Sequence, residues 1–109
     1  MACVTLLVGC TKEMDARRQH WLDSAGACPA PATCSAKMTA AAREISICAP
    51  ALDKQALGAG DVVVVRELVG AHDTVGRIKQ RRSAGFDVEF PDGATLERSS
   101  DVVIARVCR

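Results

Sequence analysis

The sequence of 109 residues contains very few aromatic side chains: one tryptophan, two phenylalanines and no tyrosine. Proteins that stack nucleic-acid bases, or that enclose ammonium groups in aromatic cages, need several aromatic rings at their surface. Trp21, Phe86 and Phe90 are too few to build either kind of platform. The shortage therefore argues against both binding chemistries.

An excess of charge of one sign and long apolar segments are also lacking. The chain carries 14 lysines and arginines against 13 aspartates and glutamates, for a formal net charge of +1. Proteins that bind phosphate backbones normally show a basic excess. No apolar run approaches the roughly 20 residues that a membrane-spanning helix requires. We therefore do not expect an integral helical membrane protein.

Motifs of catalysis and metal binding are missing as well. The sequence has no glycine-rich phosphate loop, no Cys-x-x-Cys pair and no Ser-His-Asp arrangement in a suitable context. His20 and His72 lack a neighbouring ligand at helical spacing, and Cys28 and Cys34 are further apart than the paired ligands of zinc sites. We predict a non-enzymatic protein without metal or other cofactor. An enzyme or regulator that is active only as an oligomer is a weaker alternative.

The strongest positive signal is a series of short strand patterns between residues 61 and 107. Four consecutive valines, Val62 to Val65, predict a strand. Residues 86–90 then alternate apolar and acidic side chains, and Asp92-Gly93 marks a hairpin turn. About five short strands at regular spacing favour a small closed barrel over an open sheet.

An aspartate-led opening strand, Gly76 in the second strand, a Phe-x-Val-x-Phe third strand and the Asp-Gly turn together resemble the Src-homology-3-like (SH3-like) and Tudor-like barrels. The resemblance implies a mainly β (α+β) fold, with a five-stranded SH3-like barrel after a helical or irregular amino-terminal extension. The surface aromatic residues of those families are absent, because Phe86 and Phe90 are both expected in the core. The resemblance therefore predicts a scaffold without the usual binding chemistry of those families, and we expect it to meet its partner through loops 70–73 and 80–85.

Four basic residues follow one another in the expected second strand: Arg77, Lys79, Arg81 and Arg82. The first three alternate, so we expect them on one face, with Arg82 beside them. They form either a patch for an anion or nucleic acid, or a solvated face balanced by Asp87 and Glu89 on the paired strand. The expected hairpin pairing favours the balanced face.

The amino-terminal extension is expected to be helical over residues 12–25, with Thr11 as N-cap and Gly26 as the stop. Trp21 falls on the apolar face of this helix. It either stacks on a ligand or packs the helix onto the barrel, and the helical spacing favours packing. Residues 35–44 predict a second short helix, followed by a strand over 44–48.

Six cysteines make the chain unusually rich in sulfur. Leu7-Val8-Gly9-Cys10, which follows an apolar run, resembles the lipobox of bacterial lipoproteins, and this resemblance implies that Cys10 carries lipid. Four cysteines then remain for two disulfides in an oxidising compartment: Cys28, Cys34, Cys48 and Cys108. Of three pairings, Cys28–Cys34 with Cys48–Cys108 is the most economical. Alternatively, residues 2–8 form a buried strand and the cysteines stay reduced.

The chain thus divides into a lipoprotein signal or buried strand at 1–10, a helical and loop extension at 11–60 and the barrel at 61–109. We expect a binding or assembly module in the bacterial cell envelope or periplasm, joined to the membrane only through a lipid anchor. Its partner is another protein or a cell-wall component. The alternative is a cytoplasmic module that binds nucleic acid or a ribonucleoprotein through Arg77, Lys79, Arg81 and Arg82.

Overall fold

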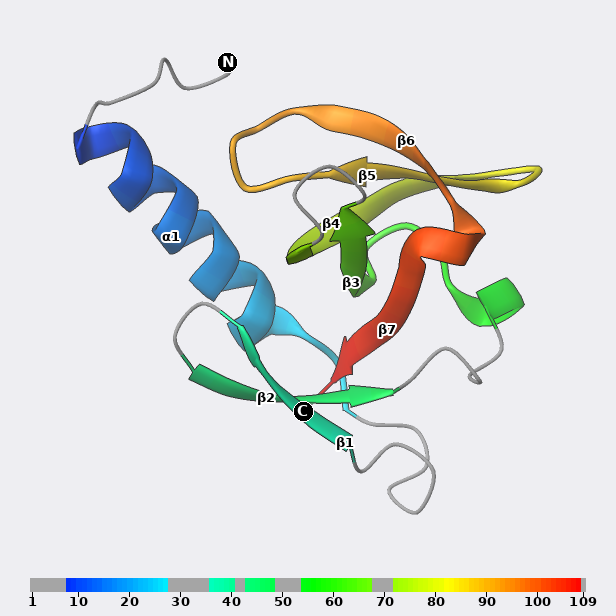
Figure 1. Cartoon of the computed structure of the whole chain (residues 1–109), viewed down its shortest axis with the longest axis horizontal. Coiled ribbons are helices and arrows are strands. Elements are labelled where there is room, and N and C mark those ends of the chain that lie inside the picture. The colour runs from blue at the N-terminus through cyan, green and yellow to red at the C-terminus, as the bar shows by residue number, and fades with distance from the viewer. Residues whose placement is uncertain (1–7, 28–35, 41–42, 49–53, 68–71, 109) are drawn as a thin grey trace.

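The computed structural model describes residues 8–27, 36–40, 43–48, 54–67 and 72–108 (Figure 1). In chain order its elements are α1 (Val8–Ser24), β1 (Ala36–Ala40), β2 (Arg43–Cys48), η1 (Lys54–Ala56), β3 (Val62–Glu67), β4 (His72–Arg82), β5 (Gly85–Glu89), β6 (Thr95–Ser99), η2 (Ser100–Val102) and β7 (Val103–Cys108). Here η denotes a short 3-10 helix. Figure 1 shows α1 on one side of the strands and both 3-10 helices on the other.

The strands form one antiparallel sheet in the order β1-β2-β7-β3-β4-β5-β6. Strands β3 to β6 are a meander in which each strand pairs with the next, and β7 returns to pair with both β3 and β2. The expected mainly β class is therefore confirmed. The sheet does not close by backbone pairing, since β1 and β6 are its two edges, so the closed barrel stays a prediction.

Strand β3 lies at the centre of the fold and is buried on both faces, as its unbroken run of valines predicts. Val62 and Val64 belong to a helix-side core together with Trp21, Leu22, Ala25, Val75, Ala105 and Val107. Val63 and Val65 belong to a strand-side core together with Leu57, Ile78, Phe86, Val88, Phe90 and Val103. Among the described residues the two cores are separate clusters on opposite faces of β3, so each face of the strand has its own packing.

Helix α1 covers the first of these cores. Trp21 is only 2% exposed, and the guanidinium carbon of Arg77 lies 5.6 Å from the centre of its ring. Packing of the helix by Trp21 is thus confirmed. The helix begins at Val8, earlier than the sequence pattern indicates, so the alternative of a strand over residues 2–8 is wrong at Val8; residues 1–7 lie outside the described part of the chain.

The predicted helix over residues 35–44 is wrong. Strand β1 occupies most of this segment and forms a hairpin with β2, in which Ala36 faces Ile47 and Ala40 faces Arg43. Helix propensity is a weak preference, and pairing with the sheet overrides it here. Strand β2 pairs in turn with β7, so the amino-terminal extension contributes two strands to the same sheet as the carboxy-terminal half.

Candidate functional site

A β-bulge in β4 separates the four basic residues. In the β4–β5 ladder, Ile78 faces Val88 but Gln80 faces Asp87, so Lys79 is an extra residue without a partner position. The bulge reverses the alternation of side chains that follow it. Arg77 consequently lies on the helix side with Trp21, whereas Arg81 lies on the strand side, 5.6 Å from the ring centre of Phe86. The prediction that these residues share one face is wrong.

Three of the four cations have partners within the chain. Arg77 forms an ion pair of 2.9 Å with Glu89. Arg81 donates from Nη1 to the carbonyl oxygens of Lys54, Gln55 and Leu57 at 3.2, 2.6 and 2.9 Å, and so holds the end of η1. Among the residues that the structure describes, only Lys79 of this group has no partner, and it is exposed. The pairing of Arg77 with Glu89 and of Arg82 with Asp87 favours charge balance across the β4–β5 hairpin over an anion patch, although the basic residues lie on two faces of the sheet.

Arg82 is held by two carboxylates. Its Nε and Nη2 donate to Asp87 at 2.7 and 2.9 Å, and its Nε also lies 3.2 Å from Glu97. The hydrogen bonds and the positive charge of Arg82 lower the pKa of the Asp87 carboxyl, against a smaller opposing effect of burial. The guanidinium of Arg82 is thus paired with carboxylates of the neighbouring strands β5 and β6.

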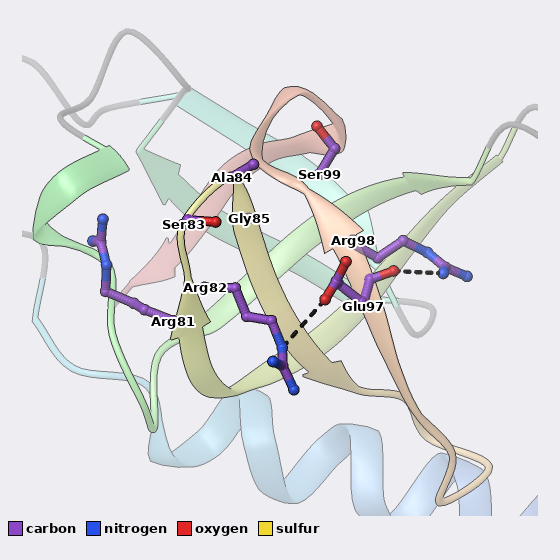
Figure 2. A pocket seen from close by; sticks show the side chains of 8 residues that line it. All are labelled: Arg81, Arg82, Ser83, Ala84, Gly85, Glu97, Arg98 and Ser99. Carbon is purple, nitrogen blue, oxygen red and sulfur yellow. Dashed lines mark hydrogen bonds and ion pairs between the residues drawn. The ribbon is translucent and has the colours of Figure 1, made fainter.

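A polar hollow of about 430 Å³ lies at the end of the β4–β5 hairpin (Figure 2). It is lined by Arg81, Arg82, Ser83, Ala84, Gly85, Glu97, Arg98 and Ser99. In Figure 2 the side chain of Arg81 points away from that of Arg82, which turns toward Glu97. Part of the predicted partner loop 80–85 forms the wall of this hollow. The charges of Arg82 and Glu97 in the wall are already paired with one another. The other predicted loop, 70–73, lies partly outside the described residues.

A second hollow, of about 250 Å³, separates α1 from the β5–β6 turn. We call it the Leu96 groove; its lining is Met14, Arg18, Glu67, Thr74, Phe90, Pro91, Asp92, Ala94 and Leu96. Leu96 is 46% exposed, and it is the only large hydrophobic side chain found exposed among the residues whose side-chain burial the structure describes. Arg17 hydrogen-bonds to the carbonyl oxygen of Pro91, which fixes α1 to one end of the groove. An apolar side chain is thus left in contact with solvent beside a partly apolar hollow.

The Leu96 groove borders a free strand edge. Within the described sheet β6 pairs only with β5. Two backbone hydrogen bonds at the ends of the β5–β6 ladder show which residues of β6 direct their N–H and C=O groups toward β5. Phe90 donates to Ala94 at 2.8 Å, and Ser100 donates to Ala84 at 3.1 Å. Backbone groups of even-numbered residues in β6 therefore point toward β5.

The odd-numbered residues of β6, Thr95, Glu97 and Ser99, direct their backbone N–H and C=O groups away from the sheet. All three side chains are exposed. The carbonyl oxygen of Glu97 accepts a hydrogen bond from Arg98, whereas the remaining outward backbone groups have no partner in the described part of the chain. The strand edge is not among the sites expected from the sequence, where its only signal is a lone leucine within Thr95-Leu-Glu-Arg-Ser99.

Cys108 is disulfide-bonded and only 3% exposed. Its predicted partner, Cys48, is not opposite it: the β2–β7 register places Ser46 opposite Cys108 and Cys48 opposite Arg106. Cys28 and Cys34 lie outside the described residues. Cys10 lies within α1, and the structure does not test its predicted lipidation.

We expect the disulfide of Cys108 to join the segment that follows α1. Diagonal residues in antiparallel strands have Cα atoms about 7–8 Å apart, but disulfides need about 4.4–6.8 Å. Arg106 donates a hydrogen bond of 3.2 Å to the carbonyl oxygen of Ala27, the residue before Cys28. Peptide mapping of unreduced protein should link Cys108 to Cys28 or Cys34. A Cys48–Cys108 peptide would contradict this prediction.

The two histidines lie on different elements. His20 is exposed on α1 and His72 begins β4. Within the described ranges there is no group of three or more side chains suited to hold a metal ion, and no helix long and apolar enough to cross a membrane. Comparison with known proteins gives no match to a family model, to a curated protein or to a solved structure.

Proposed function

We propose that this chain is a non-enzymatic protein-binding or assembly module, and that it binds an extended segment of a partner protein along the free edge of β6. One observation carries the proposal: the outward backbone groups of β6 lie beside Leu96, which is 46% exposed at the edge of its groove. An exposed edge of this kind recognises a peptide by adding it as a further strand. Backbone hydrogen bonds supply affinity, and the groove supplies selection of a side chain.

The SH3-like architecture remains part of this proposal. The order β7-β3-β4-β5-β6 and the turn of 3-10 helix before β7 support it. Strands β6 and β3 do not pair through their backbones, but Arg98 reaches Glu67 at 3.2 Å from one to the other. This ion pair bridges the open side where a barrel would close. The bridge leaves the outward backbone of β6 available for a partner.

An envelope location also remains a proposal, and the disulfide at Cys108 supports it because structural disulfides persist in oxidising compartments. A lipid anchor at Cys10 would then join the module to a membrane surface. Between a protein and a cell-wall component, the free backbone edge favours a protein, since a peptide offers the matching row of donors and acceptors. The nucleic-acid alternative has less support, because Arg77, Arg81 and Arg82 already have partners.

Selection from a random peptide library displayed on phage tests the proposed edge. Thr95→Pro removes an outward N–H and places a ring in the path of an added strand, while the β5–β6 ladder keeps its hydrogen bonds. We expect peptides selected on the unaltered chain to bind Thr95→Pro at least about tenfold more weakly, equal to about 1.4 kcal/mol. Thr95→Ala keeps the N–H and is expected to bind as the unaltered chain does.

The proposal would be overturned by two results. One is that no peptide is enriched over selection on the unfolded, reduced chain. The other is that enriched peptides bind the unaltered chain and Thr95→Pro equally well while circular dichroism shows both proteins folded.

A further inference from the structure

We infer that the partner of the β6 edge is a second copy of this chain, bound by antiparallel pairing of the two β6 strands about a twofold axis at Leu96. The inference rests on the proposed function, namely that this edge accepts an extended segment. It names the segment as β6 itself, Thr95–Ser99. The sheets of the two copies would then join into one continuous sheet.

The direction of the backbone groups limits how two β6 strands can pair. Outward groups belong to Thr95, Glu97 and Ser99, so these residues of one copy must face outward residues of the other. For pairings near the middle of the strand, the twofold axis then passes through Leu96, Glu97 or Arg98. A register that differs from these by a single residue would place an odd-numbered residue opposite an even-numbered one. The even-numbered residue points its backbone groups toward β5, so no ladder of hydrogen bonds could form.

Charge selects among these three registers. An axis at Glu97 places two carboxylates directly opposite one another, and an axis at Arg98 does the same with two guanidinium groups. Like charges in directly opposite positions destabilise a strand pair. An axis at Leu96 instead places the two leucines together, with Glu97 facing Thr95 and Arg98 facing Ala94. Of the three registers, only the one with its axis at Leu96 avoids both repulsions and also covers the exposed leucine.

Charged residues often protect an edge strand from pairing, but those of β6 are already engaged within the chain. Glu97 lies 3.2 Å from Nε of Arg82, and Arg98 lies 3.2 Å from Glu67. Arg98 also stacks on the face of Phe90, with 5.2 Å between its guanidinium carbon and the ring centre. Both side chains are thus held against their own chain, and in the register at Leu96 neither of them faces a like charge.

The expected dimer is weak and reversible. A strand of five residues contributes a small contact area, below the roughly 1,200 Å² that marks the lower limit of stable interfaces. Association should therefore depend on concentration, and partly monomeric samples are expected in the micromolar range. The Leu96 groove, which lies beside the axis, would be narrowed when the edge is covered.

Analytical ultracentrifugation of the full chain, with its disulfides intact, tests the inference. Between about 5 μM and about 1 mM, the average mass should rise from that of one copy toward that of two. Thr95→Pro should weaken association at least tenfold, and Thr95→Ala should leave it unchanged. Electrophoresis without reductant distinguishes this dimer from one linked by an intermolecular disulfide.

A charge-pairing experiment tests the register. Leu96→Lys and Leu96→Glu should each stay monomeric, because two like charges then face one another. An equimolar mixture of the two variants should form a heterodimer, since the lysine of one copy faces the glutamate of the other. A second register would not produce this rescue, because the altered residues would no longer be opposite.

Each outcome has a defined meaning. A chain that stays monomeric up to about 1 mM overturns the inference; if selected peptides still lose affinity for Thr95→Pro, the proposed binding edge survives without self-association. A dimer that forms but is unaffected by Thr95→Pro overturns the β6 interface. A dimer that responds to Thr95→Pro but shows no rescue by the Leu96 mixture overturns the register.

Discussion

Gly85→Ala is expected to lower the free energy of unfolding by about 3 kcal/mol, at the upper end of the usual cost of overpacking. A Cβ atom at this position would collide with the carbonyl oxygen of Arg98 and lie 3.0 Å from Cα of Ser99. Both obstacles are backbone, so no side-chain rotation relieves them. Strand β6 would have to move away from β5 at the point where it enters η2.

Gly58→Ala is the matched control, because a Cβ atom there meets nothing within 4 Å. The same methyl group should leave stability unchanged or raise it slightly by restricting the unfolded chain. Urea unfolding followed by circular dichroism measures both variants. Equal midpoints for the two would show that β5 and β6 are not as close at Gly85 as the structure has them.

Trp21→Ala is expected to cost about 3–5 kcal/mol. The indole is the largest fully buried side chain of the helix-side core, and its loss would leave a cavity between α1 and β3. The guanidinium of Arg77 would also lose the ring on which it lies. Because small domains are stable by only about 5–15 kcal/mol, this single change should remove much of the stability of the fold.

The neighbouring exposed residue His20 provides the control for this change. His20→Ala alters the same helix without touching the core, so its effect should remain within about 0.5 kcal/mol. Alanine is a strong helix former, and a cost seen only at Trp21 therefore reports lost packing and not a weaker helix. Similar unfolding curves for both variants would mean that α1 is not docked on the sheet through Trp21.

The sequence pattern predicted the parts of the fold that depend on local side-chain order. The run Val62 to Val65 indicated a strand, and the structure shows why the run is unbroken: both faces of β3 are covered. The turn at Asp92-Gly93 is present as well, with Gly93 at a φ of 92° and its N–H bonded to the carbonyl of Phe90. These features follow from residue type and need no distant contact.

Features that depend on distant pairing were not predictable. The segment 35–44 has helix-forming residues, yet it becomes β1 because β2 finds a partner in β7 far along the chain. No residue type near Lys79 indicates a bulge in the sequence. Yet the bulge places Arg77 and Arg81 on opposite faces of the sheet. The candidate edge was missed for the same reason: whether a strand is central or peripheral is a property of the whole sheet.

The central position of the last strand has a consequence for the order of folding. Strand β7 separates β2 from β3, so the β1–β2 hairpin has no neighbour in the sheet until β7 is in place. The meander from β3 to β6 can form from nearby segments, whereas β7 must reach back to residues synthesised much earlier. Contacts between such distant segments slow folding. We therefore expect the β1–β2 hairpin to join the sheet last, because β2 can pair with it only after β7 has docked against β3.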